Sequence, residues 1–261
     1  MNRLVTAEDA AWAGAFAIRR NWSTARALDV EFKKSSADVA TRLDRLADEA
    51  VKTSLRSGDP HSRILSEEDS RAPLASELSS DAWLVDPLDG SHNASLGLPV
   101  VGVAVSWAHG GRVRTAVVVD VFGARSLGAN DAEVRIRGAL SVREPSAGGI
   151  VALHQNYSTP RGSRRLAQVR DRLESTFPRV LYSWCPVIDF LLTASGHMVG
   201  WVAVAVGGPE YDAIRYLSRR IGLEERQLDT GTPGGVGARH TFVTGWPSRL
   251  DELERAVTRC A

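Results

Sequence analysis

The chain has 261 residues, of which 43% are hydrophobic and 24% are charged, with 32 Lys+Arg against 31 Asp+Glu. This length allows a substantial core, and the net charge of +1 excludes both a strongly basic nucleic-acid binder and an acidic disordered chain. The two cysteines, Cys185 and Cys260, cannot form a disulfide framework. No apolar run approaches the roughly 20 residues of a membrane span, and the N-terminus lacks the apolar region of a secretion signal. We therefore expect a soluble, cytoplasmic protein.

The first half of the chain is predicted to contain helices followed by strands. Periodic patterns indicate, in chain order, helices over 4–28 and 38–56, a buried strand over 82–85, and strands over 100–107 and 112–121. The last two strands flank His109-Gly110-Gly111 and are typical of a hairpin. The β-rich stretch is expected to end near residue 142.

The second half alternates between the two types of element. The predicted segments are a strand over 149–153, helices over 161–175 and 187–195, a strand over 199–206, a helix over 211–222 and a loop over 231–237. Alternation of this kind favours α/β layers. We expect an α+β N-terminal region over 1–145 and an α/β C-terminal region over 146–261, with the boundary between Pro145 and Gly149.

The segment WLVDPLDGSHN, residues 83–93, carries the clearest chemical signal. A buried strand is expected to end at Asp86, and Asp89 follows three residues later, before a turn at Gly90. Two converging carboxylates repel one another unless a hard cation such as Mg²⁺ binds between them. The backbone N–H groups of Gly90 and Ser91, at a helix start, suit an anion. The alternative interpretation is a simple Asp-Pro turn capped by Asp89.

Several ordered segments resemble the inositol monophosphatase superfamily of Mg²⁺-dependent, lithium-sensitive phosphatases. They are KSSADVATRLD (34–44), ILSEED (64–69), WLVDPLDGSHN (83–93), IDFLLTASGHMVGW (188–201) and YDAIRYLSRRIG (211–222). In ILSEED, Ser66 replaces a family glycine, and Tyr211 replaces the tryptophan of the Trp-Asp motif. The resemblance implies a layered α-β-α-β-α fold, a homodimer and two or three Mg²⁺ ions at each site.

The resemblance also implies roles for individual residues. The metal ligands would be Glu67, Asp86, the backbone carbonyl of Leu88, Asp89 and Asp212. Asp44 and the hydroxyl of Ser91 would be catalytic and orient the attacking water, and Gly90 and Ser91 are assigned to phosphate binding. His92 stands where the family often has Thr or Arg; we assign it to phosphate binding, and the alternative is that it only donates a hydrogen bond at the helix start. We expect one metal, held by Glu67 and Asp86, to activate this water, and another, held by Asp86, Asp89 and Asp212, to stabilise the leaving oxygen.

The part of the site that binds the leaving group departs from the family pattern. The glutamate expected seven residues before Asp212 is Ala205, and Trp184-Cys185 replaces a Gly-Ser/Thr pair. We therefore assign Trp184, Cys185 and Glu210 to substrate binding. Trp184 either stacks on a base or sugar face or packs in the core or at a subunit contact, and Glu210 either replaces the missing glutamate or is exposed.

The predicted function is Mg²⁺-dependent hydrolysis of a small phosphate monoester, first a sugar or cyclitol phosphate. The runner-up is a nucleotide-type 3′-phosphatase acting on an adenosine bisphosphate-like substrate. A non-catalytic descendant that binds phosphorylated ligands is the alternative outside enzymes. We expect neither a nucleic acid polymer nor a membrane as a partner.

Overall fold

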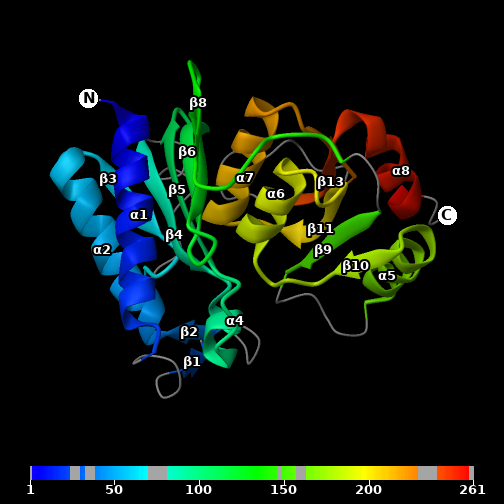
Figure 1. Cartoon of the computed structure of the whole chain (residues 1–261), viewed down its shortest axis with the longest axis horizontal. Helices are drawn as coiled ribbons and strands as arrows, with labels where there is room; N and C mark the ends of the chain where they lie inside the picture. The colour runs from blue at the N-terminus through cyan, green and yellow to red at the C-terminus, as the bar shows by residue number, and fades with distance from the viewer. Residues whose placement is uncertain are drawn as a thin grey trace.

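The computed structural model describes residues 2–23, 30–32, 39–69, 81–145, 149–156, 163–228 and 240–258. Its elements stack in five layers, α-β-α-β-α, as expected, and all five can be followed from left to right in Figure 1. The loop predicted over 231–237 lies outside these residues. Within them, no helix is both long and apolar enough to cross a lipid bilayer.

The first two layers come from the N-terminal part of the chain. The sheet has the order β3-β4-β5-β6-β7-β8, parallel between β3 and β4 and antiparallel elsewhere. Its strands are β3 (Arg63–Ser66), β4 (Ala82–Asp89), β5 (Gly102–His109), β6 (Arg112–Asp120), β7 (Arg125–Asn130) and β8 (Val134–Arg137). Helices α1 (Arg3–Asn21) and α2 (Arg42–Gly58) pack on its outer face, where they bury a hydrophobic cluster against β4, β5 and β6.

The second sheet has the order β10-β9-β11-β13-β12 and mixed strand directions. Its strands are β9 (Ile150–Gln155), β10 (Arg179–Leu181), β11 (Gly200–Val206), β12 (Glu224–Gln227) and β13 (His240–Gly245). Helices α5 (Arg164–Thr176) and α8 (Pro247–Thr258) cover its outer face. The largest core cluster lies between the two sheets and includes α6 (Pro186–Ala194) and α7 (Pro209–Arg220).

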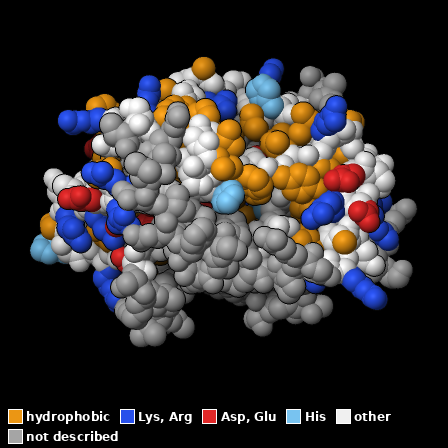
Figure 2. All heavy atoms as spheres, turned by 90° about the horizontal axis from the view of Figure 1, so that it is seen from below, with side chains coloured by type: hydrophobic (Ala, Val, Ile, Leu, Met, Phe, Trp, Pro, Cys, Tyr) orange, Lys and Arg blue, Asp and Glu red, His pale blue; other side chains and the backbone are white. Residues whose placement is uncertain are grey.

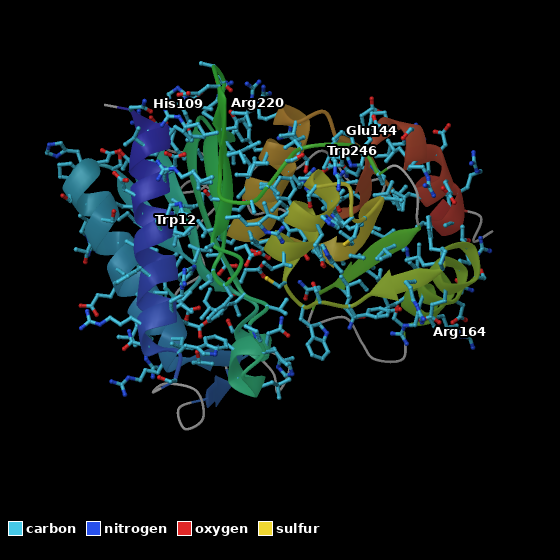
Figure 3. All side chains as sticks on the ribbon, in the orientation of Figure 1. Trp12, His109, Glu144, Arg164, Arg220 and Trp246 are labelled. Carbon is cyan, nitrogen blue, oxygen red and sulfur yellow. The ribbon has the colours of Figure 1, made fainter. Side chains whose placement is uncertain are left out.

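Two features define the ends of this stack. The short helix α4 (Ser91–Leu96) and the pair β1 (Val30–Phe32) and β2 (Val39–Thr41) lie at the lower end in Figure 1. The predicted β5–β6 hairpin is confirmed, with Gly110 and Gly111 both at positive φ, and its residue His109 lies at the opposite end in Figure 3. Trp246, also labelled there, donates from Nε1 to the carbonyl of Thr193 at 2.9 Å and links the second sheet to α6.

Several predicted boundaries were wrong for identifiable reasons. The helix predicted over 38–56 begins only at Arg42, because Thr41 caps α2 and Asp44 completes a capping box, leaving 39–41 in β2. The helix predicted over 4–28 ends at Asn21, where the N–H of Trp22 donates to the Arg19 carbonyl; residues 24–28 lie outside the described part. The second half follows the predicted order, but β10, β12, β13 and α8 were not predicted.

Candidate active site

The sequence analysis predicted that the strand ends at Asp86, and this was wrong. Strand β4 continues through Pro87 to Asp89. Asp86 pairs with Ala104 of β5 and Asp89 pairs with Gly102, so β4 advances three residues while its partner advances two. This extra residue is a β-bulge. Residues three apart normally face opposite sides of a sheet, so the bulge is the reason that Asp86 and Asp89 lie on the same face.

Asp44 and Ser91, which are 47 positions apart in the sequence, meet at the end of β4. The Ser91 hydroxyl donates to Asp44 Oδ1 at 2.5 Å, and the Leu88 carbonyl lies 3.0 Å from the same hydroxyl. The other carboxylate oxygen of Asp44 accepts the backbone N–H of Thr41 at 2.7 Å and its hydroxyl at 2.6 Å. Asp44 is fully buried, and these bonds hold its carboxylate in one orientation.

Gly90 makes the turn from β4 into α4 with a φ of +94°. A Cβ at this position would lie 2.8 Å from the carbonyl oxygen of Val100, so both the backbone conformation and the space require glycine. The N–H groups of Ser91 and His92 belong to the first turn of α4 and have no acceptor within the helix. They are therefore available to an external anion.

Three carboxylates, one of them Asp86 of β4, gather at another point of the fold. Ligand atoms of Glu67, Asp86 and Glu210 all lie within 4.8 Å of one another. Glu67 directly follows β3, and its N–H donates to the carbonyl of Val85 in β4 at 2.9 Å. Glu210 is the second residue of α7, which begins at Pro209. Three elements distant in sequence thus contribute one carboxylate each.

The electrostatics of this group fit a bound cation. Burial, followed by the charge of Glu67, raises the pKa of Asp86 well above its ordinary value. The same two causes, in the same order, raise the pKa of Glu210. Oε2 of Glu210 is shielded from solvent and has no hydrogen-bond partner among the described residues. Buried carboxylates that repel one another are stabilised by a divalent cation, and oxygen ligands favour Mg²⁺, Ca²⁺ or Mn²⁺.

Asp89 lies on the same face of β4 as Asp86, and residues at the start of α6 hold its carboxylate. Its Oδ2 accepts the backbone N–H of Val187, at the start of α6, at 2.6 Å and the thiol of Cys185 at 3.2 Å. Burial is the largest influence on the pKa of Asp89 and raises it to about 7 in spite of these two hydrogen bonds, and the charge of Glu67 adds to the rise.

The assignment of Cys185 to substrate binding needs correction. Its side chain is fully buried and its thiol donates to Asp89 Oδ2 at 3.2 Å, so it contacts that carboxylate and has no exposed surface to offer a substrate. Burial raises the pKa of the Cys185 thiol well above its ordinary value, which keeps the proton that it donates.

Asp212, which the resemblance makes a metal ligand, is not a member of the three-carboxylate group found among the described residues. Asp212 is partly buried on α7, and its backbone N–H donates to the Gly208 carbonyl at 3.0 Å. Its charge contributes to the raised pKa of Glu210, after larger effects of burial, Glu67 and Asp89. Glu210, which was assigned to the substrate, instead lies with Glu67 and Asp86.

Trp184 lies outside the hydrophobic core, with 48% of its surface exposed. Its φ is +53°, a left-handed conformation uncommon for a residue with a bulky side chain. The ring makes an edge-on contact with His92 of α4, with 5.1 Å between ring centroids. The core alternative for Trp184 is thus wrong, and a substrate contact and a subunit contact both remain open.

Supporting polar residues were missed by the sequence analysis. The Asn93 side chain donates to the carbonyls of Val100 and Ser183 at 2.8 and 2.7 Å, which ties α4 to the segment before α6. The Ser183 hydroxyl donates to Asp189 at 2.5 Å, and a ring nitrogen of His154 lies 2.8 Å from the same carboxylate oxygen. No spacing pattern could have revealed this group, because its members meet only after folding.

The fold and the site together define a layered α/β protein with a group of three carboxylates, Glu67, Asp86 and Glu210, whose arrangement could hold a metal ion. A model of the inositol monophosphatase family matches residues 2–202. The chain therefore belongs to the inositol monophosphatase family.

Individual relatives carry more than one name. The Nus factor SuhB of Pseudomonas aeruginosa is 33% identical over 88 residues, which are 34% of this chain and 32% of that protein. An inositol monophosphatase of Mesembryanthemum crystallinum is 32% identical over 117 residues, or 44% of this chain and 42% of that protein. The matched region thus spans about a third of the length of the SuhB protein and less than half of the length of the plant inositol monophosphatase.

Solved structures extend the likeness in fold to almost the whole chain. The suhB protein of Bartonella henselae has a TM-score of 0.82 at 18% identity and covers 98% of each chain. An IMPase/NADP phosphatase solved with Mg²⁺ and phosphate has a TM-score of 0.76 at 16% identity, covering 94% of this chain and 90% of that one. At these identities the comparison establishes the fold.

Proposed function

We propose that this protein is a Mg²⁺-dependent phosphatase that hydrolyses a small phosphate monoester with water as the nucleophile. The observation that carries the proposal is the hydrogen bond from Ser91 to the buried Asp44, in a chain that also gathers an acidic group suited to cations. A protein that only bound phosphate would not need this pair, because neither residue carries a positive charge to offer an anion.

The cation ligands in this proposal are Glu67, Asp86, the Leu88 carbonyl, Asp89 and Asp212, for two or three ions. When bound, Mg²⁺ neutralises phosphoryl charge and lowers the pKa of a coordinated water. The chain supplies the rest: the bulge in β4 aligns two of the carboxylates, and α6 orients Asp89 through its backbone N–H.

Ser91 and Asp44 position and deprotonate the attacking water. The single proton of the Ser91 hydroxyl is donated to Asp44, so Ser91 Oγ retains lone pairs that accept a hydrogen bond from water. As water attacks, its proton can pass to Ser91 Oγ while the serine proton moves to Asp44. Two bonds from Thr41 hold Asp44 still during this transfer. Backbone N–H groups of Gly90, Ser91 and His92 bind the phosphate oxygens.

The preferred substrate class is a sugar or cyclitol phosphate. The second candidate is a nucleotide-type 3′-phosphate, and the exposed ring of Trp184 beside His92 favours it, because a planar base can stack on an accessible indole. The name of the IMPase/NADP phosphatase shows that a protein of this fold is described as acting on a nucleotide.

A non-catalytic binding protein is the candidate from another class, and relatives named Nus factor SuhB are the reason to test it. The retained Ser91–Asp44 hydrogen bond argues for catalysis. The net charge of +1 favours a small phosphorylated ligand over a nucleic acid polymer.

We also propose a cytoplasmic homodimer. Figure 2 shows hydrophobic side chains gathered on the face seen from the α4 end. The exposed apolar residues Leu96, at 60%, and Leu98, at 45%, belong to α4 and the segment after it. Light scattering of the wild type and Leu96→Asp tests this, since a monomeric wild type would remove the proposal.

A panel of phosphate monoesters, assayed with Mg²⁺ and with or without lithium, separates the candidate functions. Turnover of sugar or cyclitol phosphates supports the first candidate, and faster turnover of nucleotide 3′-phosphates supports the second. Tight binding of phosphorylated ligands without any turnover would favour the binding protein.

A further inference from the structure

Glu210 is a carboxylate for which the resemblance assigns no metal ligand role. Its Oε2 is shielded from water and has no hydrogen-bond partner in the described part of the chain. Oxygens of Glu67 and Asp86 lie within 4.8 Å of its own ligand atom. A negative charge is costly in this setting, and burial and the charge of Glu67 raise the pKa of Glu210 although a backbone hydrogen bond lowers it. A proton or a cation would relieve this cost.

The backbone before α7 is built around this carboxylate. Gly208 precedes the helix with a φ of +153°, which favours glycine. A Cβ on Gly208 would lie 2.3 Å from Oε2 and 2.8 Å from Oε1 of Glu210. The missing side chain of Gly208 therefore leaves the space that the Glu210 carboxylate occupies.

A substrate hydroxyl is the competing partner for Glu210. A hydroxyl would donate one hydrogen bond but would leave three carboxylates repelling one another. A divalent cation neutralises two charges at once and accepts oxygens from several carboxylates. The proximity of Glu67 and Asp86 therefore favours the cation.

We propose that Glu210 directly ligates a divalent cation, forming a three-carboxylate site with Glu67 and Asp86, and that Gly208 is required for this ligation. The inference rests on the proposed function, because the cation is the one that the phosphatase uses. It gives Glu210 a ligand role in addition to that proposed for Asp212.

Mn²⁺ binding in the absence of substrate tests the proposal without relying on activity. Free Mn²⁺ is measured by electron paramagnetic resonance during titration of the full-length wild type, Glu210→Gln, Gly208→Ala and Glu68→Gln. Glu68 is the matched control, because its charge also raises the pKa of Asp86 although it is outside the three-carboxylate group.

We expect Glu210→Gln to weaken the tightest Mn²⁺ site by roughly tenfold or more, since affinity follows the number of charged ligands. Gly208→Ala should produce a similar loss, and Glu68→Gln a change of less than about threefold, because it removes only a screened neighbouring charge. Glu210→Gln should also melt at the same or a higher temperature than the wild type in EDTA, but gain less stability from Mn²⁺.

Two failures can be told apart. If the wild type binds no Mn²⁺, the metal-dependent function itself is wrong. If the wild type binds Mn²⁺ and folded Glu210→Gln binds it equally well, only the assignment of Glu210 is overturned, and a raised KM for substrate would then identify Glu210 as a substrate contact. Equal losses in Glu210→Gln and Glu68→Gln would also overturn it, since nonspecific charge would then explain both.

A Glu210→Gln variant that does not fold would be replaced by Glu210→Asp. Its shortened side chain should also weaken Mn²⁺ binding, and unchanged binding would contradict direct ligation.

Discussion

Replacing Asp89 with Asn should change how the stability of the metal-free protein depends on pH. Asn keeps the shape and the carbonyl oxygen that can accept the Val187 N–H, but it has no charge to bury. In the wild type, burial is the main cause that raises the pKa of Asp89 from 3.8 to about 7. Between these values the folded protein holds a proton that the unfolded chain has lost, so stability falls as the pH rises.

The magnitude follows from the size of this shift. Each pKa unit corresponds to about 1.4 kcal/mol, so a shift from 3.8 to about 7 destabilises the folded, metal-free protein by about 4 kcal/mol at alkaline pH. From about pH 5 to about pH 8 the loss through Asp89 alone is about 2–3 kcal/mol. The pKa values of Asp86 and Glu210 are also raised, so their ionisation acts in the same direction.

Urea unfolding in EDTA, followed by the fluorescence of tryptophans such as the buried Trp83 and Trp201, measures this dependence. The wild type should become less stable as the pH is raised, and Asp89→Asn should flatten the slope and be the more stable protein at about pH 8. Added Mg²⁺ should remove most of the wild-type slope. Equal slopes in the two metal-free proteins would refute the reasoning, because burial of the Asp89 charge would then have no measurable cost.

Four further substitutions test other parts of the site. Asp44→Asn and Ser91→Ala should each lower kcat by roughly 10²–10⁴-fold, and the double variant should be little worse, because the pair acts as a unit; additive losses in steady-state assays would contradict this. Gly90→Ala should lower the free energy of unfolding by at least about 1–3 kcal/mol, because its Cβ would lie 2.8 Å from the Val100 carbonyl oxygen; an unchanged urea midpoint would exclude the strain. Trp184→Gly should fold normally, since glycine accepts the φ of +53°, and should selectively raise KM for nucleotide substrates; an unchanged substrate ranking would exclude stacking.

The motif around Asp86 and Asp89 was predictable from sequence, but the way in which it works was not. The spacing of three suggested a turn after a strand, whereas the structure achieves the same convergence with a bulge inside β4. The pairing of Asp44 with Ser91 could be expected only from the family resemblance, since 47 residues separate them and no local pattern connects them.

The position of Glu210 could not be predicted, because it depends on the backbone of a neighbouring residue. Both Glu210 and Asp212 lie in the first turn of α7, and the sequence alone gives no reason to prefer either as the partner of Glu67. In the structure the missing side chain of Gly208 leaves room for the Glu210 carboxylate, since a Cβ there would lie 2.3 Å from Oε2. The short polar strand β12 (Glu224–Gln227) was also not predicted. It has no apolar pattern and exists because it pairs with β13 at the edge of the sheet.

The most direct test of the central claim is release of inorganic phosphate by the purified wild type and by Asp89→Asn, with Mg²⁺ and with EDTA. The wild type should turn over at least one small phosphate monoester with Mg²⁺ and none with EDTA. Asp89→Asn should fold, and it should release phosphate at least roughly 100-fold more slowly than the wild type. Loss of a residue that only supports a metal ligand costs roughly 10–100-fold in activity, and loss of Asp89 should reach or exceed the upper end of that range. Hydrolysis that persists in EDTA, or a fully active Asp89→Asn, would contradict metal-dependent catalysis at this site.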